Sequence, residues 1–248
     1  MMDIVMIILR DNSTFKNLLK LTQKKHRREQ GLCIIEGEKV VREHATDATQ
    51  IFAREKFPSY MEGCPKGGVV LSAKLFDEVG SLETSQGILA IIPIPKPEKI
   101  TFPYLVLDGI QDPGNMGTIL RTAAAFGFCT VFCINCVDVW SQKVLRASSA
   151  TQFALNIFES SFEEFKTIFD TDLKDGKLFI ADLNGSMNDK PADKFGLVLG
   201  NEGRGISDAM KTLPHKTVTI PLEKSVESLN VAVAGGILMY KLQCTNCK

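Results

Sequence analysis

The sequence has no apolar stretch long enough to cross a membrane. Its largely apolar opening, residues 1–9, ends at Arg10 and Asp11, whereas a spanning helix needs about 20 apolar residues. A secretory signal would carry positive charge before such a run and small residues after it, and the sequence has neither. We therefore predict a soluble, cytoplasmic protein, with Met2 or Met6 as alternative start residues.

The sequence also has no excess of charge of either sign. Its 248 residues include 29 basic and 29 acidic residues. Net charge therefore gives no overall signal for nucleic acid, and any RNA-binding surface has to come from local clustering. The 44% hydrophobic and 23% charged residues are typical of a folded globular chain, which excludes global disorder.

Disulfide and metal-ligand patterns are missing as well. The seven cysteines, an odd number without regular spacing, predict reduced thiols in the cytosol. Three of them have the C-x-x-x-C-x-x-C spacing of some iron–sulfur enzymes: Cys129, Cys133 and Cys136. A strand predicted over residues 130–134 would hold the first two about 13 Å apart, too far to share a cluster. Cys244 and Cys247 lack the further ligands of a zinc site, so we predict no metal.

Proline marks the one predicted domain boundary. Four prolines between residues 93 and 103 predict an extended linker, which separates domains over residues 1–95 and 101–248. The front domain is predicted as a small α/β domain with helices over 14–25, 38–44 and 73–79 and strands over 32–35, 50–53, 69–71 and 88–92.

Alternation of strands and helices is stronger behind the linker. Strands are predicted over 104–108, 130–134, 178–183, 197–200 and 218–220. Helices are predicted over 116–126, closed by Gly127, and over 142–149, 162–169, 207–213 and 230–242. Several of these strands are apolar at consecutive positions, which is typical of a parallel sheet covered on both faces.

The first candidate motif follows the strand predicted over 104–108. It reads Leu-Asp-Gly-Ile-Gln-Asp-Pro-Gly-Asn-Met-Gly over residues 107–117, with Arg121 in the next helix. Open α/β sheets bind ligands at the loops where strands end. Two structural alternatives remain: Asn115 stands where a helix N-cap would, and Arg121, about 1.7 turns further on, is an ordinary surface residue.

The second candidate motif also joins a strand to a glycine-rich loop. Residues 197–205 read Leu-Val-Leu-Gly-Asn-Glu-Gly-Arg-Gly, and the glycine order differs from the G-x-G-x-x-G of dinucleotide sites. A tight turn that needs positive φ is the structural alternative. Three glycines beside an Asn-Glu pair instead favour a loop whose backbone closely approaches a flat ligand.

The third candidate motif consists of Ile-Pro-Leu at 220–222 and Glu-Ser-Leu-Asn-Val-Ala-Val-Ala-Gly-Gly at 227–236. A strand ends at a proline, and a loop then enters a helix of small residues. The structural alternative is that Ser228 only caps this helix. The small residues permit close packing, including packing of one chain against another.

Together the three motifs resemble the SpoU/TrmH family of RNA ribose 2′-O-methyltransferases, within the SPOUT superfamily. The resemblance covers residues 104–248. In the front half, Gly-Leu-Cys-Ile-Ile-Glu-Gly-Glu-Lys at 31–39 and Ser-Gln-Gly-Ile-Leu-Ala at 85–90 resemble the RNA substrate-binding domain appended to members of that family. The resemblance implies a C-terminal parallel-sheet domain with a deep trefoil knot, a smaller N-terminal α/β RNA-binding domain and a homodimer.

The resemblance also implies a set of site residues. Four positions correspond to catalytic residues: Asn115, Arg121, Ser228 and Asn230. The methyl donor S-adenosylmethionine would be held mainly by backbone groups of the second and third motifs, at Leu199, Gly200, Ile220 and Leu229, with Glu202 at the acidic position of the second motif.

A general base is hard to find among these residues. No histidine falls in the three motifs, and histidine is the usual base. The family often assigns this role to the arginine, but a guanidinium holds its proton so firmly that it normally stays charged. Arg121 could instead bind the adjacent phosphate and stabilise the developing alkoxide.

The sequence thus predicts transfer of a methyl group from S-adenosylmethionine to a ribose 2′-hydroxyl of structured RNA, ribosomal RNA first and transfer RNA as the alternative. Two other classes stay open. A silent RNA-binding protein would lack methyl transfer, and an oxidoreductase built on the second motif would bind NAD.

A basic run near the start adds a candidate RNA contact. It comprises Lys16, Lys20, Lys24, Lys25, Arg27 and Arg28. A solvated helix face is the structural alternative, but beside an RNA-binding domain such a run favours contact with phosphates.

Overall fold

The computed structural model describes residues 5–56, 68–80, 86–183, 185 and 193–244. The chain divides into two compact units. Unit 1 combines Met1–Pro95 with Trp140–Ala150, and unit 2 combines Lys96–Val139 with Thr151–Lys248. Unit 1 therefore includes a short segment that the sequence places between two strands of unit 2. Within the described part of the chain, no helix has the length and apolar character needed to cross a membrane, and the cytoplasmic location stays a prediction.

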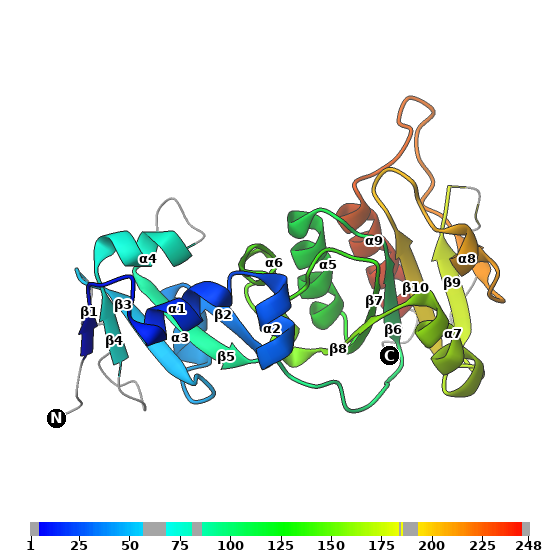
Figure 1. Ribbon diagram of the computed structural model, residues 1–248. Helices are drawn as coiled ribbons and strands as arrows, with labels where there is room; N and C mark the ends of the chain where they lie inside the picture. Colours follow the sequence, from blue (N-terminus) through cyan, green and yellow to red (C-terminus); the bar gives the residue numbers. More distant parts are fainter. Residues whose placement is uncertain (1–4, 57–67, 81–85, 184, 186–192, 245–248) are drawn as a thin grey trace. The chain divides into compact units, whose positions relative to one another are not determined.

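Unit 1 is built on a mixed five-stranded sheet with the order β1-β4-β3-β5-β2 (Figure 1). Its strands are β1 (Val5–Ile7), β2 (Leu32–Glu36), β3 (Gln50–Arg54), β4 (Gly68–Leu71) and β5 (Ile88–Pro93). Strands β1, β4 and β3 run parallel, and β5 is antiparallel to β3 and β2. Its helices are α1 (Ser13–Lys20), α2 (Lys24–Gln30), α3 (Glu38–Glu43), α4 (Ala73–Val79) and α6 (Gln142–Ala147).

The basic run lies on two helices, which corrects the prediction of one helix over 14–25. Helix α1 begins after Asn12, whose side chain accepts from the backbone N–H groups of Thr14 and Phe15. It ends at Lys20, and α2 starts only at Lys24. Arg27 of α2 is 5% exposed, and its Nη1 donates to the carbonyl of Leu21 at 2.7 Å. Arg27 therefore holds the turn between the helices and leaves the candidate phosphate-binding set.

Unit 2 is built on a six-stranded sheet with the order β11-β9-β10-β6-β7-β8. All neighbouring strands run parallel. The strands are β6 (Tyr104–Asp108), β7 (Thr130–Ile134), β8 (Asn156–Ser160), β9 (Lys177–Ala181), β10 (Phe195–Gly200) and β11 (Lys216–Val218). The helices are α5 (Pro113–Ala125), α7 (Phe162–Thr171), α8 (Asp208–Lys211) and α9 (Val231–Cys244), with a 3₁₀ turn at Thr151–Ala154.

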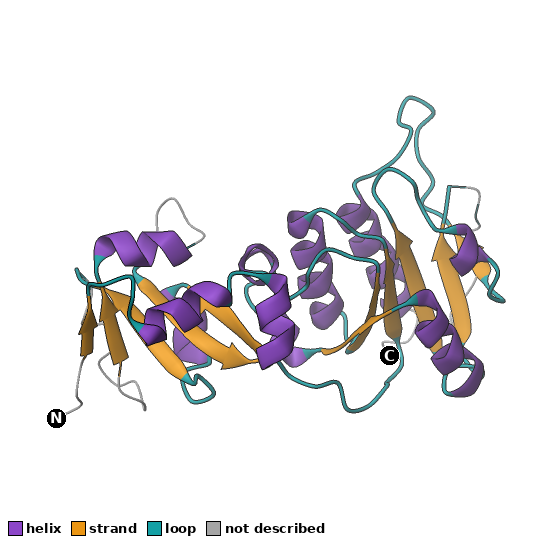
Figure 2. Ribbon diagram, viewed as in Figure 1, coloured by secondary structure: helices purple, strands orange, loops and turns teal. Residues whose placement is uncertain are grey.

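Helices cover both faces of this sheet (Figure 2). Val198 of β10 shares a buried cluster with Phe165 of α7 and Met210 of α8. The next residue, Leu199, points to the opposite face and contacts Gly235 of α9, and α9 packs against α5. The predicted α/β class with a parallel-sheet domain is therefore confirmed.

Element boundaries differ from the predictions at particular places. Strands β1 and β8 were not predicted, and α5 begins at Pro113, three residues earlier than expected. The stop of α5 at Gly127 is confirmed, because Gly127 has φ +75° and the N–H of Phe128 returns to the carbonyl of Ala123 at 2.9 Å. This pairing is the Schellman motif.

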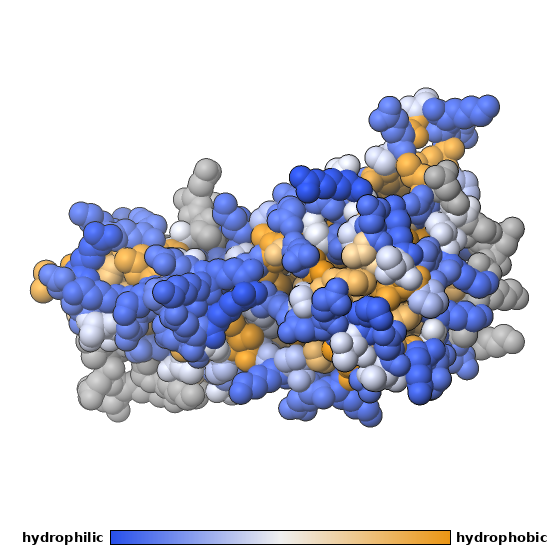
Figure 3. Space-filling view, turned by 45° about the vertical axis from the view of Figure 1, so that its right-hand side comes forward, coloured by the Kyte–Doolittle hydropathy of each residue, from blue (hydrophilic) through white to orange (hydrophobic). Residues whose placement is uncertain are grey.

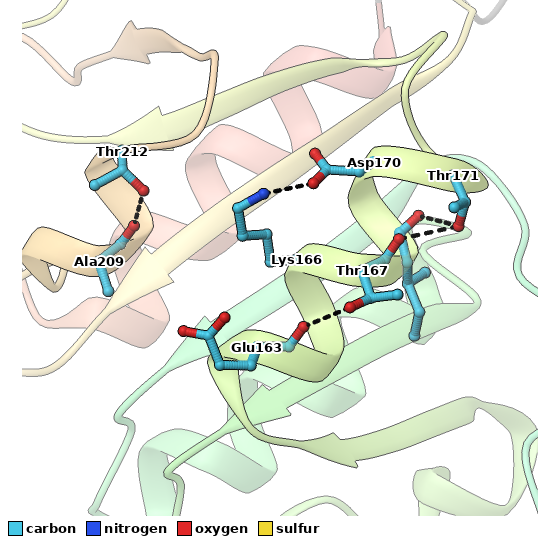
Figure 4. A network of polar contacts seen from close by, with 8 residues as sticks. Glu163, Lys166, Thr167, Asp170, Thr171, Ala209 and Thr212 are labelled. Carbon is cyan, nitrogen blue, oxygen red and sulfur yellow. Dashed lines mark hydrogen bonds and ion pairs between the residues drawn. The ribbon is translucent and has the colours of Figure 1, made fainter.

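Helix α7 begins at a capping signal that is visible in the sequence, and its exposed side is polar. Ser161 and Glu164 form a capping box. Along the helix, Lys166 pairs with Asp170 and the hydroxyl of Thr167 donates to a backbone carbonyl one turn earlier (Figure 4). Exposed pairs of this kind contribute little to stability, so Lys166 is a suitable position for control substitutions.

Replacing Gly196 with alanine is expected to destabilise the protein by about 3 kcal/mol, because overpacking a core costs about 1–3 kcal/mol. A Cβ at Gly196 would lie 2.1 Å from Cζ of Tyr104, its partner across the strands. Urea unfolding measures the loss. Tyr104→Phe is the matched control: within the described residues the buried Tyr104 hydroxyl has no hydrogen-bond partner, so removing it should keep or raise stability. Equal stability of Gly196→Ala and wild type would contradict the tight contact.

Candidate active site

The sheet of unit 2 has a switch point between β6 and β10. These strands are neighbours in register, with Leu107 beside Leu199 and Asp108 beside Gly200. After β6 the chain continues through α5 to β7, and after β10 it continues through α8 to β11, on the other side of the pair. Parallel sheets bind ligands where connections leave in opposite directions like this. We name the segments that follow β6, β10 and β11 the first loop (residues 109–112), second loop (residues 201–206) and third loop (residues 219–230).

The first loop ends in a helix cap that excludes one interpretation of Asn115. Asp112 is the N-cap of α5, and its side chain accepts from the backbone N–H of Asn115 at 2.7 Å. Pro113 takes the first helical position, where its missing N–H costs nothing. Asn115 therefore lies inside the first turn, and its side chain is not used for capping.

The second loop closes on itself. The backbone groups of Asn201 and Gly205 exchange two hydrogen bonds of 2.9 Å. The Asn201 Oδ1 accepts from the N–H groups of Gly203 and Arg204, at 3.0 and 2.9 Å, while its Nδ2 donates to the carbonyl of Gly109 at 2.7 Å. Asn201 thus ties the second loop to the first. The sequence prediction did not name it, although an asparagine in a glycine-rich turn is a signal for such a role.

Glu202 joins the same two loops through its carboxylate. Its oxygens accept from the backbone N–H groups of Gln111 and Asp112, at 3.3 and 3.1 Å, and from Asn115 Nδ2 at 3.2 Å. Burial by itself would raise the pKa of Glu202, but these bonds and one from its own backbone outweigh it and lower the pKa below the usual value. Glu202 is therefore a carboxylate at neutral pH, and its predicted contact with the cofactor stays a prediction.

The third loop brings Asn230 to Asn115. Asn230 Nδ2 donates to Asn115 Oδ1 at 2.9 Å. The Asn230 Oδ1 accepts from the N–H groups of Ala232 and Val233, at 2.9 and 3.3 Å, so Asn230 caps α9. This excludes the interpretation of Ser228 as the cap.

The other two predicted catalytic residues are exposed, and each is close in sequence to one of the two asparagines. Ser228 is exposed two residues before Asn230, and Arg121 is exposed on α5, six residues after Asn115. The structure thus joins Asn115 and Asn230 by a hydrogen bond, and it presents Ser228 and Arg121 to solvent.

The predicted cofactor residues lie at the end of β10 and along the second and third loops. Gly200 has a backbone neighbour where a side chain would be, since a Cβ there would lie 2.4 Å from the carbonyl carbon of Gly205. Ile220 and Leu229 are half-buried at either end of the third loop, whereas Leu199 is buried. The tip of the third loop, the orange segment of Figure 1, is largely hydrophilic in Figure 3. Over residues 220–229, all of them described, the backbone makes one hydrogen bond to other backbone, from the N–H of Val226 to the carbonyl of Glu223, so these groups fit a ligand held by backbone.

The cysteines near the first loop do not assemble a metal site. Strand β7 spans Thr130–Ile134 as predicted, with Cys133 buried and Cys129 exposed. Cys136 donates from its Sγ to the carbonyl of Leu107 at 3.2 Å. Among the described residues, no group of three or more potential ligands could hold a metal ion. Cys247 lies outside the described residues.

This fold and these loops define the class: a parallel-sheet α/β protein in which an asparagine of the first motif meets the G-N-E-G-x-G and S-L-N motifs at the switch point. A family model described as the SpoU rRNA Methylase family matches residues 103–240. A second, described as an MRM3-like substrate binding domain, matches residues 12–90. The chain belongs to the SpoU rRNA methylase family.

Two similar proteins match this chain over nearly its whole length. The chain is 31% identical to the 23S rRNA (guanosine(2553)-2′-O)-methyltransferase of Bacillus subtilis, over 94% of this chain and 96% of the relative. A structure of a putative RNA methyltransferase of the TrmH family from Porphyromonas gingivalis has 29% identity and a TM-score of 0.81, covering 94% of this chain and 98% of its own.

A more distant structure supports the fold alone. The SpoU methyltransferase AviRb of Streptomyces viridochromogenes, in complex with AdoMet, has 21% identity and a TM-score of 0.84, covering 95% of this chain and 98% of its own. The deep trefoil knot implied by the sequence resemblance stays a prediction for this chain.

Proposed function

We propose that this protein transfers a methyl group from S-adenosylmethionine to a ribose 2′-hydroxyl of ribosomal RNA. The observation that supports this most directly is the hydrogen-bonded junction at the switch point, where Asn115 in the first turn of α5 binds Glu202 of the second loop and Asn230 of the third loop. Family membership supports the reaction, and the Bacillus subtilis relative, named for 2′-O-methylation of 23S rRNA, supports the substrate. Transfer RNA is the alternative substrate.

We assign the site residues to two groups, one that binds the cofactor and one that faces the ribose. S-adenosylmethionine, when bound, supplies a methyl group on a positively charged sulfonium. Backbone groups at Gly200, Ile220 and Leu229 hold it, beside Leu199. Asn115, Arg121, Ser228 and Asn230 face the ribose. Arg121 binds the adjacent phosphate and stabilises negative charge on the 2′ oxygen, because a guanidinium stays charged. The reaction needs no metal.

A methyl-transfer assay with purified protein tests the proposal. Radiolabel should pass from S-adenosylmethionine to ribosomal RNA, and alkaline digestion should leave the modified linkage intact because the 2′ oxygen is blocked. Mapping of 2′-O-methyl sites in cells with and without the protein identifies the nucleotide. Transfer to transfer RNA alone would select the alternative substrate, and transfer to no RNA would refute the function.

We also assign separate roles to the two predicted domains, with RNA capture in residues 1–95 and methyl transfer in residues 101–248. Two observations support the first role. The family model for a substrate-binding domain matches residues 12–90. The two front-half motifs adjoin, since the N–H of Glu38 donates to Gln86 Oε1 at 2.8 Å and that of Gly37 to the carbonyl of Ile88 at 3.2 Å.

Replacing Lys24, Lys25 and Arg28 with alanine should weaken RNA binding and flatten its dependence on salt. Each phosphate neutralised adds about 0.7–0.9 to the log–log slope, so the triple variant should lose up to about 2.5 units. Fluorescence anisotropy over a series of salt concentrations measures this slope.

Arg27→Ala is the matched control for that experiment. Because Arg27 is buried against Leu21, its loss should lower thermal stability and leave the slope of the folded protein unchanged. An unaltered slope in the triple variant would identify the basic run as a solvated helix face.

A homodimer through α9 is the assembly we propose. The sequence argument from small residues needs correction, because Gly235 contacts Leu199 and Gly236 lies against Thr122 within the same chain. The outer side of α9 provides the support instead. Val233, Ile237 and Tyr240 are 51%, 40% and 58% exposed, at helical spacings that align them on one side. Exposed apolar stripes of this kind mark association surfaces.

Ile237→Asp should convert the dimer to a monomer, because a carboxylate in the centre of an apolar interface has no partner. Sedimentation velocity at micromolar concentration reads the change. Leu183→Asp is the control, since Leu183 is an exposed apolar residue of the same unit, 62% exposed, outside α9. A wild-type protein that sediments as a monomer would refute the assembly.

A further inference from the structure

Three side chains at the switch point form one continuous chain of hydrogen bonds. Asn230 Nδ2 donates to Asn115 Oδ1 at 2.9 Å, and Asn115 Nδ2 donates to Glu202 Oε1 at 3.2 Å. We name this chain the amide relay. It connects the third loop, the first turn of α5 and the second loop, so the orientation of each amide depends on the next.

The two ends of the amide relay fix its direction. At one end, the backbone N–H groups of Ala232 and Val233 can only donate, so the oxygen of Asn230 has to face them. At the other end a carboxylate can only accept, so the nitrogen of Asn115 has to face Glu202. The middle bond then has one possible direction, from Asn230 to Asn115. The assignment of oxygen and nitrogen in both amides follows from donor chemistry at the ends.

A count of the amide N–H groups shows which donors of the amide relay remain available to a ligand. An amide nitrogen carries two hydrogens, and within the described residues Asn115 and Asn230 each use one. Asn201 is the contrast: its nitrogen donates to Gly109 and Glu202, and its oxygen accepts from two backbone N–H groups. Asn201 is therefore fully used as a brace, whereas Asn115 and Asn230 each keep one N–H donor.

We propose that Glu202 is a positioning residue that orients the amide relay, so that Asn115 and Asn230 offer N–H donors to the ribose oxygen. This rests on the proposed function. As the 2′ oxygen bonds to the methyl carbon, the bond from that carbon to sulfur breaks, S-adenosylhomocysteine is released, and the hydroxyl proton passes to solvent, to which Ser228 and Asn230 are exposed. The negative charge that builds on the oxygen is stabilised by an N–H donor and would be repelled by an amide oxygen. The pair therefore stabilises the alkoxide and does not receive the proton. The ionised state of Glu202 supports this role, because a carboxylate has two accepting oxygens and no proton that would face the surrounding donors.

Asn230→Asp separates this role from a structural one. Aspartate keeps the acceptor for the N–H groups of Ala232 and Val233, and its charge suits a helix N-terminus. Thermal stability should therefore hold or rise. The variant cannot donate to Asn115 or to the ribose, so kcat should fall about 100- to 1000-fold with an unchanged Kd for S-adenosylmethionine. A kcat within threefold of wild type would overturn the proposal.

Glu202→Gln tests the amide relay without any need for methyl transfer. A glutamine of the same shape turns an N–H group toward some of the donors around it and frees Asn115 to rotate. In ¹H–¹⁵N spectra, the side-chain amide signals of Asn230 should shift, because Asn115 connects Asn230 to Glu202. Those signals are identified by their absence in Asn230→Asp. Unshifted Asn230 signals would overturn the relay, and failure of the wild type to methylate RNA would refute only the proposed function.

Discussion

Arg121→Ala is expected to lower methyl transfer about 1000-fold while the protein stays folded and binds S-adenosylmethionine normally. Loss of a single donor to a developing oxyanion costs about 100- to 1000-fold, and Arg121 supplies a permanent charge as well. Its side chain is exposed on α5, and surface substitutions usually change stability by less than about 0.5 kcal/mol. Single-turnover rates with ribosomal RNA measure the loss.

Two further variants serve as controls for the Arg121→Ala measurement. Arg121→Lys keeps the charge but loses the planar fork that pairs with phosphate, so it should have an intermediate rate. Lys166→Ala removes an exposed cation from α7 of the same unit and should leave the rate unchanged. Near wild-type turnover in Arg121→Ala would remove Arg121 from the catalytic set and leave the charge at the 2′ oxygen to Asn115 and Asn230.

The location of the site could be predicted because strand ends are strong local signals. Strands β6 and β10 are consecutive apolar residues that stop at Asp108 and Gly200, and buried parallel strands have this pattern. Their adjacency could not be predicted, since many residues separate them in the chain and pairing depends on tertiary packing. The switch point became visible only with the order of the strands.

The predicted helix boundaries were wrong where a side chain outside the apolar pattern determines where the helix starts or ends. The pair Asp112 and Pro113 is a cap followed by a first-turn proline, a start signal that periodicity alone ignores. The break between α1 and α2 depends on Arg27, whose guanidinium reaches back to the carbonyl of Leu21. An arginine in a basic run predicts exposure, and only the fold shows that one member of the run is buried.

Cross-loop bonds explain the part of the site that the sequence left open. The motifs name Asn115 and Asn230, but 115 positions separate them, and the bond between them exists only because the third loop returns to the start of α5. The same holds for Glu202. The resemblance assigns it to the cofactor site, whereas in the structure its carboxylate accepts hydrogen bonds from the backbone of the first loop. Sequence supplies the chemical groups, and the order of the strands supplies their partners.

Gly200→Ala is expected to weaken S-adenosylmethionine binding up to about 100-fold, because overpacking costs about 1–3 kcal/mol and each loss of about 1.4 kcal/mol changes affinity about tenfold. A Cβ there would lie 2.4 Å from the carbonyl carbon of Gly205 and 2.6 Å from its oxygen. Both atoms are backbone, so no side-chain rotation relieves the clash. The second loop has to open, which breaks the paired bonds between Asn201 and Gly205 and moves Glu202. Isothermal titration calorimetry measures the affinity.

Gly203→Ala is the control in the same loop, because its Cβ would meet nothing closer than Asn201 Oδ1 at 3.8 Å. That variant should bind S-adenosylmethionine within a few-fold of wild type. The overpacked Gly200→Ala should lose about 1–3 kcal/mol of stability and still unfold cooperatively, so its loss of binding is read on folded protein. If the folded Gly200→Ala variant binds with wild-type affinity, the second loop does not hold the cofactor. The backbone groups of the third loop, from Ile220 to Leu229, would then have to hold it without the second loop.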